Sequence, residues 1–327
     1  MIVLGIESTA HTFGIGIFDS EKNKILSNVK HMFKPPLGIG MLPREASEHH
    51  YKICDKILKE ALNEARIKPQ DIDLISFAQG PGLGACLRIG ASVARFLSLE
   101  LKKPLVGVNH CIAHLEVAKI TTPAKDPIML YVSGGNTQII AFDEGKYRVF
   151  GETQDIPVGN LFDVFARNAG LPMPGGPVIE KLALKGRKYL SLPYAVKGMD
   201  VSFSGILTSA TKMLQKEKLN DICFSLQETA FSMLVEVSER AMAHCNKKEL
   251  VLAGGVAANK RLREMCNIMC KERGAKFFVP EFQYCCDNGA MIAVLGAIEY
   301  DAGVETKIKE SKIKTKWRTN EVEVKWV

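Results

Sequence analysis

The sequence lacks the features of membrane, secreted and disulfide-bonded proteins. None of its apolar runs approaches the roughly 18 residues that a membrane-spanning helix needs. The run from Met1 to Ile6 ends at Glu7 and has no basic residues before it, which argues against a signal peptide and predicts a buried strand. None of the nine cysteines forms a C-x-x-C pair, so we interpret them as mostly reduced thiols of a cytosolic protein.

A strong excess of one charge is also absent. The 43 Lys and Arg residues stand against 36 Asp and Glu residues, and the formal net charge of +7 permits a polyanionic partner without requiring one. Hydrophobic residues make up 46% of the chain and charged residues 24%, which excludes disordered, collagen-like and coiled-coil classes. At roughly 100–200 residues per domain, a chain of 327 residues predicts two domains.

Two parts of the chain repeat the same pattern. Residues 3–27 and 129–149 each read as a strand, a polar turn, an alternating strand, a charged turn and a third strand. This pattern predicts a three-stranded antiparallel meander in each half. Residues 73–97 and 249–269 each read as a short apolar strand, a Gly-rich loop and a helix.

Each half also carries an amphipathic helix before its strand–loop–helix unit, over about 45–66 and 220–245. The same elements in the same order predict two related α/β domains, 1–125 and 126–299, the second with an insertion near 160–205. Ligands of such folds bind where Gly-rich turns converge, usually in the cleft between the halves.

The segment NHCIAH carries the most specific chemistry. His110 and His114 are four residues apart on a predicted helix, so both imidazoles share one face and suit a single metal ion. Asp287, in a polar turn before a helix start, is a candidate third ligand, and a mixed His and carboxylate set suits iron or zinc. The alternative is a hydrogen-bonded structural pair of histidines. A zincin peptidase is disfavoured because Cys111 stands where H-E-x-x-H has its glutamate.

Three further segments favour a nucleotide. The turn Ser133–Gly135 lets backbone N–H groups approach a phosphate. Asn259 falls near a helix start after two glycines, a site that suits a nucleotide's polar group. A rigid Pro- and Gly-rich loop at 170–177 is flanked by Asp163 and Glu180, whose carboxylates would hold ribose hydroxyls. Each segment also has a plain structural interpretation: a hairpin turn, a strand-to-helix turn, and a loop with a capping acid.

Two more segments stand out. Gly80-Pro-Gly-Leu-Gly84 is the counterpart, in the first half, of the glycines before Asn259. Residues 307–318 hold six basic residues in twelve, with Trp317 among them. This stretch either contacts nucleic-acid phosphates or is a solvated charged tail, and charge runs usually stay hydrated. We expect the tail, 300–327, to pack back on the first domain.

Taken together and in order, these segments resemble one family. NHCIAH, YVSGGNTQ, VGNLFDVFAR, GLPMPGGP, KGMDVSFSG, GGVAANKRL and CDNGAMIA closely resemble the universal tRNA threonylcarbamoyladenosine transferase family, formerly called O-sialoglycoprotein endopeptidases. GIESTAHT and KGMDVSFSG look like its archaeal/eukaryotic branch, the catalytic subunit of the KEOPS complex. The resemblance covers nearly the whole chain.

The resemblance implies an actin-like fold, of the sugar-kinase and heat-shock-ATPase type, with two duplicated ribonuclease-H-like domains and a central cleft. It implies transfer of a threonylcarbamoyl group from threonylcarbamoyl-adenylate to N6 of adenosine 37 in tRNAs that read ANN codons. It also implies one metal ion held by His110, His114 and Asp287, with Tyr131 as a further ligand in the archaeal branch. A phenolate ligand would favour iron over zinc or magnesium, and the metal would act as Lewis acid and template.

The resemblance further implies that ATP or threonylcarbamoyl-adenylate binds in the cleft. The residues implied for that role are Tyr131, Val132, Ser133, Gly134, Gly135, Asp163, Gly176, Glu180 and Asn259. The implied partners are tRNA and the KEOPS subunits: a small kinase-like ATPase, a dimerising subunit and a further small subunit. A separate enzyme would supply the adenylate, and the location would be the cytoplasm, without membrane contact.

Several positions depart from the family's usual motifs, namely Ala85, Cys86, Met173 and the stretch Leu161-Phe162-Asp163-Val164, and they bear on loop shape and nucleotide affinity. Rival functions are an actin-fold kinase or ATPase, a non-catalytic scaffold and a metal-dependent glycoprotease. A fold of this type does not fix a function. The two histidines and Asp287 argue against the kinase and the scaffold, and the missing glutamate argues against the protease.

Overall fold

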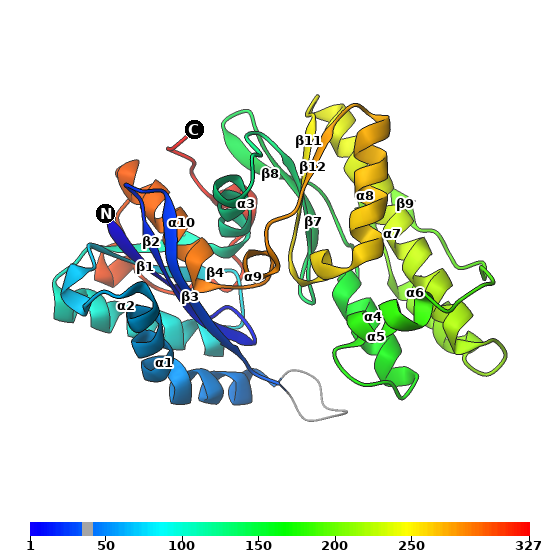
Figure 1. The fold of residues 1–327 in the computed structure, drawn as a ribbon, viewed down its shortest axis with the longest axis horizontal. Coiled ribbons are helices and arrows are strands. Elements are labelled where there is room, and N and C mark those ends of the chain that lie inside the picture. Colours follow the sequence, from blue (N-terminus) through cyan, green and yellow to red (C-terminus); the bar gives the residue numbers. More distant parts are fainter. Residues whose placement is uncertain (35–41) are drawn as a thin grey trace. The chain divides into compact units, whose positions relative to one another are not determined.

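The structure is a computed structural model that describes residues 1–34 and 42–327 (Figure 1). The chain forms two compact units. Unit 1 comprises Met1–Thr121, Gly145–Tyr147 and Cys286–Val327, and unit 2 comprises Thr122–Glu144 and Arg148–Cys285. The chain therefore passes between the units more than once.

Unit 1 is built on a five-stranded sheet with the order β3-β2-β1-β4-β5. The bounds of its strands are β1 Ile2–Glu7, β2 Thr12–Asp19, β3 Lys24–Met32, β4 Leu74–Gly80 and β5 Leu105–Asn109. The meander β1–β3 is antiparallel, whereas β4 and β5 continue the sheet in parallel with β1. The first predicted meander is thereby confirmed.

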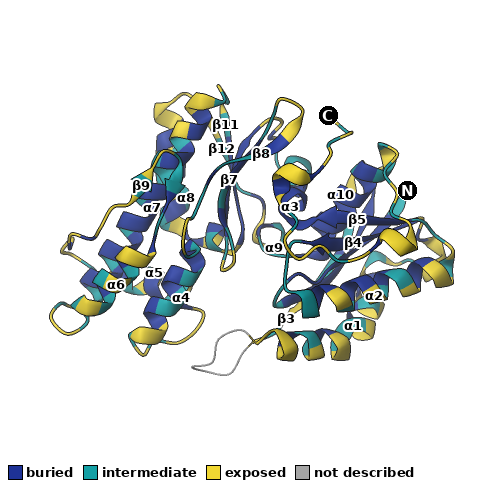
Figure 2. Ribbon diagram, turned by 180° about the vertical axis from the view of Figure 1, so that it is seen from behind, coloured by how far each residue is buried: buried dark blue, intermediate teal, exposed yellow. Residues whose placement is uncertain are grey.

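The described residues of unit 1 form the helices α1 Pro43–Ala65, α2 Gly84–Leu101, α3 His110–Thr121 and α10 Gly289–Asp301. Short 3-10 turns occur at Pro69–Asp71, Ile308–Glu310 and Thr319–Glu321. The helix expected over 45–66 is α1, whose buried face includes Ile57 and Ala61, one helical turn apart. Figure 2 shows the buried faces of α1 and α2 turned toward the sheet and their exposed faces outward.

Helix α10 packs on β1 and β2 at unusually short range. A Cβ atom added to Gly16 of β2 would lie 2.1 Å from the backbone nitrogen of Ala290, so only glycine allows this approach. Because α10 belongs to the first sheet, the second unit ends at Cys285, earlier than the expected boundary at residue 299.

Unit 2 repeats the sheet of unit 1 with the order β12-β11-β6-β7-β8. The strands of this sheet are β6 Ile128–Val132, β7 Thr137–Asp143, β8 Lys146–Glu152, β11 Glu249–Ala253 and β12 Lys276–Phe278, and only the first two residues of β8 count with unit 1. As in unit 1, the central strand β6 has an antiparallel neighbour, β7, on one side and a parallel neighbour, β11, on the other. The matching strand orders confirm the duplication that the sequence predicts.

The helices of unit 2 are α4 Val158–Asn168, α5 Gly175–Ala183, α6 Ser204–Met213, α7 Leu219–His244, α8 Lys260–Glu272 and α9 Phe282–Cys285, with a 3-10 turn at Gly255–Ala258. A small hairpin, β9 Val196–Lys197 and β10 Asp200–Val201, precedes α6. The segment near 160–205, where the sequence predicts an insertion, holds most of α4, α5 and this hairpin. The helix expected over 220–245 is α7.

Two further findings complete the fold. No disulfide joins any of the nine cysteines, all of which lie in the described ranges, and Cys266 and Cys270 are buried in the core of unit 2 as packing residues. Among the described residues, no helix combines the length and the apolar character that crossing a membrane requires.

Candidate metal centre and nucleotide-binding residues

The two histidines lie at the start of α3, directly after β5. The side-chain oxygen of Asn109, the last residue of β5, accepts hydrogen bonds from the backbone N–H groups of Cys111 (3.0 Å) and Ile112 (3.3 Å). This capping starts the helix at His110. His110 and His114 then lie one turn apart, with ring centroids 4.8 Å apart and their planes nearly perpendicular.

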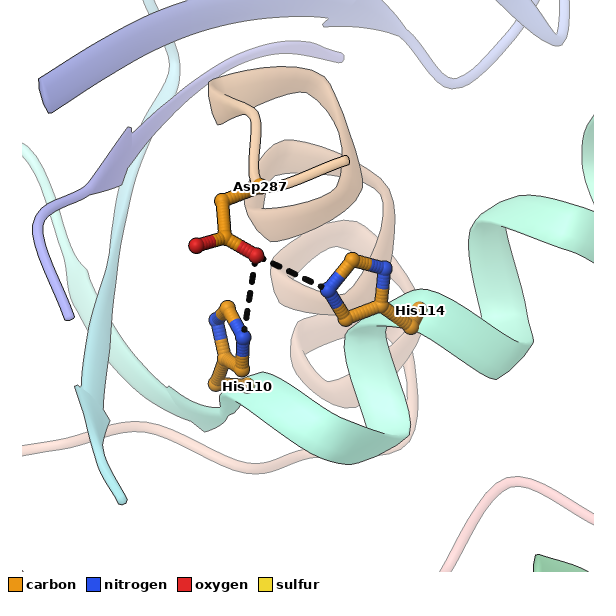
Figure 3. A group of neighbouring side chains, drawn as sticks. All are labelled: His110, His114 and Asp287. Atoms are coloured by element: carbon orange, nitrogen blue, oxygen red, sulfur yellow. Dashed lines mark hydrogen bonds and ion pairs between the residues drawn. The ribbon is translucent and has the colours of Figure 1, made fainter. Parts of the chain in front are cut away.

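Asp287 approaches both imidazoles from the loop before α10 (Figure 3). Its Oδ1 atom lies 3.5 Å from His110 Nε2 and 3.3 Å from His114 Nε2. The next residue, Asn288, caps α10 by accepting a hydrogen bond from Met291 N at 2.9 Å, which fixes the position of the loop. One ligand atom from each of the three side chains lies within 4.8 Å of the others, the one such trio in the described part of the chain.

Glu7, at the end of β1, supports His110 from behind. Its Oε2 atom lies 2.9 Å from His110 Nδ1, and its Oε1 atom accepts hydrogen bonds from the backbone N–H (2.6 Å) and hydroxyl (2.5 Å) of Thr9. Glu7 is fully buried. A carboxylate on the far nitrogen of a ligating histidine fixes its tautomer and ring orientation. Glu7 therefore leaves Nε2 of His110 as the nitrogen directed at Asp287.

The electrostatics of the trio fit a cation. Burial lowers the pKa of His110, but Glu7 and Asp287 outweigh it and raise that pKa to about 9. Burial, together with the neighbouring His110, lowers the pKa of His114. Burial would raise the pKa of Asp287, yet the two imidazoles hold it well below its usual range. The site thus favours positive charge between two imidazoles and a carboxylate, a donor set that suits zinc or iron.

Tyr131 and Val132, both in the predicted substrate set, end strand β6 of unit 2 and are buried. All three members of the His110, His114 and Asp287 trio belong to unit 1. Ligation by Tyr131 stays a prediction from the family resemblance.

The Gly-Gly segment after β6 forms a tight turn. The hydroxyl of Ser133 accepts hydrogen bonds from Gly135 N (3.2 Å) and Asn136 N (3.0 Å). A Cβ atom on Gly134 or Gly135 would meet no atom within 4 Å, so the turn's surface is open within unit 2. The backbone of Ser133 also accepts a hydrogen bond from Gly159 N at 3.2 Å, which ties the turn to the start of α4.

The predicted carboxylates bind the starts of neighbouring helices in the same unit. Asp163 of α4 accepts a hydrogen bond from Gly175 N (2.8 Å) at the start of α5, one residue before Gly176. Glu180 of α5 accepts one from Lys260 N (2.7 Å) at the start of α8. Carboxylates expected to hold ribose hydroxyls therefore also complement helix N-termini.

Asn259 is the N-cap of α8, as the sequence predicts for a residue at a helix start. Its side-chain oxygen accepts hydrogen bonds from Arg261 N (2.9 Å) and Leu262 N (3.1 Å), and its amide donates to Gln227 at 3.0 Å. With Glu180 on Lys260 N, the first N–H groups of α8 are bound by the chain itself. A phosphate has no open N–H groups there, whereas a nucleoside hydroxyl or ring nitrogen still finds polar side chains.

The remaining Gly-rich loop, 80–84, is covered by the C-terminal segment. Gly82 N donates a hydrogen bond to Thr315 O at 3.2 Å, and a Cβ atom on Gly80 would lie 1.9 Å from Lys314 O. The similarity of this loop to the glycines before Asn259 therefore does not create a second phosphate site.

Sequence reasoning missed Glu7 and Thr9. The available signal was an acid that ends an apolar strand and is followed by Ser and Thr in GIESTAHT. An acidic residue at the end of a buried strand needs a polar partner. What sequence alone could not give is the identity of that partner, since His110 follows some hundred residues later.

The chain is similar to known proteins in sequence and in fold. The family model described as tRNA N6-adenosine threonylcarbamoyltransferase matches residues 24–294. A protein of that name from Thermococcus sibiricus is 57% identical over 328 residues, covering 100% of both chains. A Methanocaldococcus jannaschii protein named "Probable bifunctional tRNA threonylcarbamoyladenosine biosynthesis protein" is 56% identical over 100% of this chain and 61% of that protein.

One solved structure extends the similarity to the fold. A crystal structure of T. kodakarensis HypF superimposes with a TM-score of 0.63 at 14% identity, covering 92% of this chain and 48% of that one. At this identity the likeness concerns the fold alone. Together with the duplicated sheets, it confirms the predicted α/β fold of actin-like type with two ribonuclease-H-like units.

Proposed function

This chain belongs to the tRNA N6-adenosine threonylcarbamoyltransferase family, and we propose that it transfers the threonylcarbamoyl group of threonylcarbamoyl-adenylate to N6 of adenosine 37 in tRNAs reading ANN codons. The N6 amine attacks the carbamoyl carbon and forms a C–N bond. The bond between that carbon and the phosphate oxygen breaks, AMP leaves, and the amine loses one proton. The observation that carries the proposal is the His110, His114 and Asp287 trio in a chain 57% identical to a transferase along its full length.

The chain's own residues prepare a metal site for this reaction. His110 and His114 offer Nε2 atoms and Asp287 offers Oδ1, and Glu7 holds the ring of His110 in place. A divalent or trivalent ion fits these donors; we favour iron, with zinc or magnesium as alternatives. When bound, the ion polarises the carbonyl or stabilises the leaving phosphate.

Unit 2 supplies the residues for the adenylate. The Ser133–Gly135 turn is suited to a phosphate, since both of its glycines are exposed and a Cβ atom on either would meet no atom within 4 Å. Asp163, Glu180 and Asn259 are held by helix starts and present polar groups for the nucleoside. The chain itself binds the first N–H groups of α8, and Ser133 Oγ binds those of Gly135 and Asn136. We therefore assign the phosphate to the glycine turn on the exposure of its two glycines.

The reaction needs partners that the chain does not contain. A separate enzyme must make the adenylate, which is a reactive mixed anhydride. The jannaschii relative's name calls that longer protein bifunctional. We propose that this chain works with the other KEOPS subunits: the kinase-like ATPase, the dimerising subunit and the further small subunit. We propose a cytoplasmic location for this reaction on tRNA.

The test is product formation with a matched histidine control. Unmodified tRNA, threonylcarbamoyl-adenylate and the KEOPS partners are mixed with wild type, His110→Ala or His244→Ala, and nucleosides are read by mass spectrometry. His244 is exposed on α7 of unit 2 and should be neutral. Product formation by His110→Ala should be lower than that of wild type by more than about 100-fold, and the variant should not retain metal, because a metal ligand is removed.

Two outcomes would contradict parts of the proposal. Equal product from wild type and His110→Ala would remove the metal from the mechanism. No product from wild type, with partners shown to be active through another catalytic subunit, would remove the transfer itself and leave the actin-fold kinase as the next candidate.

A further inference from the structure

The C-terminal segment of unit 1 concentrates the charge of the chain. Residues 307–318 hold six basic residues and one acidic residue, a net charge of +5, whereas the whole chain carries +7. All six basic side chains are exposed. Within the described ranges, none of the five lysines among them has an ion-pair partner: Lys307, Lys309, Lys312, Lys314 and Lys316.

The structure shows that this segment is anchored. Residues 304–318, which we call the strap, lie along β4, β5 and α2 and are held through their backbone and small polar side chains. Arg95 of α2 donates from Nε to the Ser311 hydroxyl (2.7 Å), and the side chain of Gln79 donates to Lys312 O (2.8 Å). Thr306 N donates to Leu105 O at 2.8 Å. A free hydrated tail would make none of these contacts.

The anchors engage the backbone of the strap rather than its lysine ammonium groups. Lys314 contributes its N–H to Gln79 O at 2.8 Å, while its ammonium group lies 3.9 Å from the ring centroid of Trp317. Fixed backbone and exposed cations together make a pre-organised cationic strip, which loses less conformational entropy on binding than a mobile tail would.

The strap is also joined to the helix of the candidate metal centre. Asn109 caps α3 with its side-chain oxygen, and the amide of the same side chain donates to Trp317 O at 3.3 Å. His110 is the next residue along the chain. The strap and the metal-binding helix thus share one anchoring residue within unit 1.

We propose that the strap is a tRNA-binding surface whose exposed lysines contact backbone phosphates and hold the substrate next to the helix of the metal centre. This inference rests on the proposed function for the identity of the RNA. Clustered Lys and Arg residues that neutralise phosphates release counterions and make affinity strongly salt-dependent. A protein partner with an acidic surface would also fit the charge, but the link through Asn109 to the metal-binding helix favours the substrate.

The experiment measures binding of an unmodified tRNA transcript to the full chain by fluorescence anisotropy at several KCl concentrations. The strap variant is Lys309→Gln, Lys312→Gln and Lys316→Gln together. The matched control is Lys24→Gln, Lys185→Gln and Lys271→Gln, three exposed lysines elsewhere with the same change in net charge. Thermal unfolding of both variants should match wild type, because none of the replaced ammonium groups has a partner.

The strap variant should bind tRNA about tenfold or more weakly at 0.1 M KCl, with a salt slope smaller by about 2–3 than that of wild type, roughly one unit per lost phosphate contact. The control should retain the wild-type slope within about one unit. Equal affinity and slope for the two variants would overturn the inference and leave an acidic protein as the partner to consider.

Failure of this inference and failure of the proposed function give different results. Binding is measured without the adenylate and does not depend on turnover. Strap-dependent binding in a protein that makes no product would keep the strap and reject the transfer. Normal product formation together with tRNA binding that does not depend on the strap lysines would keep the transfer and reject the strap as the tRNA-binding surface.

Discussion

Among single residues, Glu7 has the clearest testable role. It is buried, it binds His110 Nδ1 and it is itself fixed by Thr9. Glu7→Gln keeps the shape but places an amide where His110 needs an acceptor, so metal affinity should fall about 10–100-fold. Competition with a chromophoric chelator measures this. Glu116→Gln, which removes another buried acid from the same unit, should stay within about twofold of wild type, and an unchanged affinity of Glu7→Gln would contradict the role.

Glu299 of α10 gives a prediction about pH. Burial raises its pKa to about 8 from an ordinary 4.5, and its Oε1 atom has no hydrogen-bond partner among the described residues. A carboxyl that binds its proton more tightly when folded makes the free energy of unfolding fall as pH rises from about 4.5 to 8 and leaves it level above that. The protonated form is therefore the stabilising one.

Glu299→Gln mimics that protonated form at every pH. Its free energy of unfolding in urea should equal that of wild type near pH 4.5 and exceed it at pH 8.5 by more than about 1 kcal/mol, since one pKa unit is worth about 1.4 kcal/mol. Glu100→Gln, an exposed acid on α2, should show no such dependence on pH. If the free energies of unfolding of wild type and Glu299→Gln changed in parallel with pH, ionisation of Glu299 would not destabilise the folded state, and the prediction would be wrong.

Among the elements, the contact between the strap and the 80–84 loop depends on one glycine. A Cβ atom on Gly80 would lie 1.9 Å from the carbonyl oxygen of Lys314, so the strap must shift in Gly80→Ala. Forced overpacking costs about 1–3 kcal/mol of unfolding free energy, and trypsin should cut the strap faster. Gly205→Ala, at the start of α6 with its nearest neighbour 4.0 Å away, should be neutral in both assays. Equal trypsin rates for the two variants would mean that the strap is not held at Gly80.

Local sequence patterns predict the helices and strands well, because whether a segment is a helix or a strand depends mainly on residues close to it in sequence. The apolar residues whose spacing predicts a helix over 45–66 form the buried face of α1. The two meanders are predicted by the alternation of apolar and polar residues along their strands. Predicting which sheet or helix an element packs against requires information about residues far away in sequence. Helix α10 is buried on nearly every side, so its periodicity cannot say which sheet it joins; the tight contact at Gly16 decides that.

The residues of the candidate site also fall into those that local sequence patterns predict and those that they do not. His110 and His114 are four residues apart, so helical spacing alone predicts that their rings are adjacent. The polar turn before α10 predicts Asp287 as a third ligand, and the structure places Asp287 against both rings. Glu7 could not be assigned to His110, and the strap could not be placed on the loop at Gly80, because no local period connects residues so far apart in sequence.

At the scale of the whole molecule, the two units should respond differently to metal. The trio and its support lie entirely in unit 1, and each unit has its own hydrophobic core. A ligand that binds only the folded state stabilises what it contacts, by about 2.7 kcal/mol at 100 times its dissociation constant. Amide hydrogen exchange should therefore slow in α3 and at the start of α10 when metal is added after chelation.

Helix α8 of unit 2 should keep its exchange rate, and His110→Ala should show no response to metal anywhere. Slowing that also reaches β6, where Tyr131 lies, would support Tyr131 as a further ligand, since its backbone would then be held by the ion. Faster or unchanged exchange in α3 on metal addition would contradict binding by His110 and His114, because their helix must be restrained when both imidazoles share one ion.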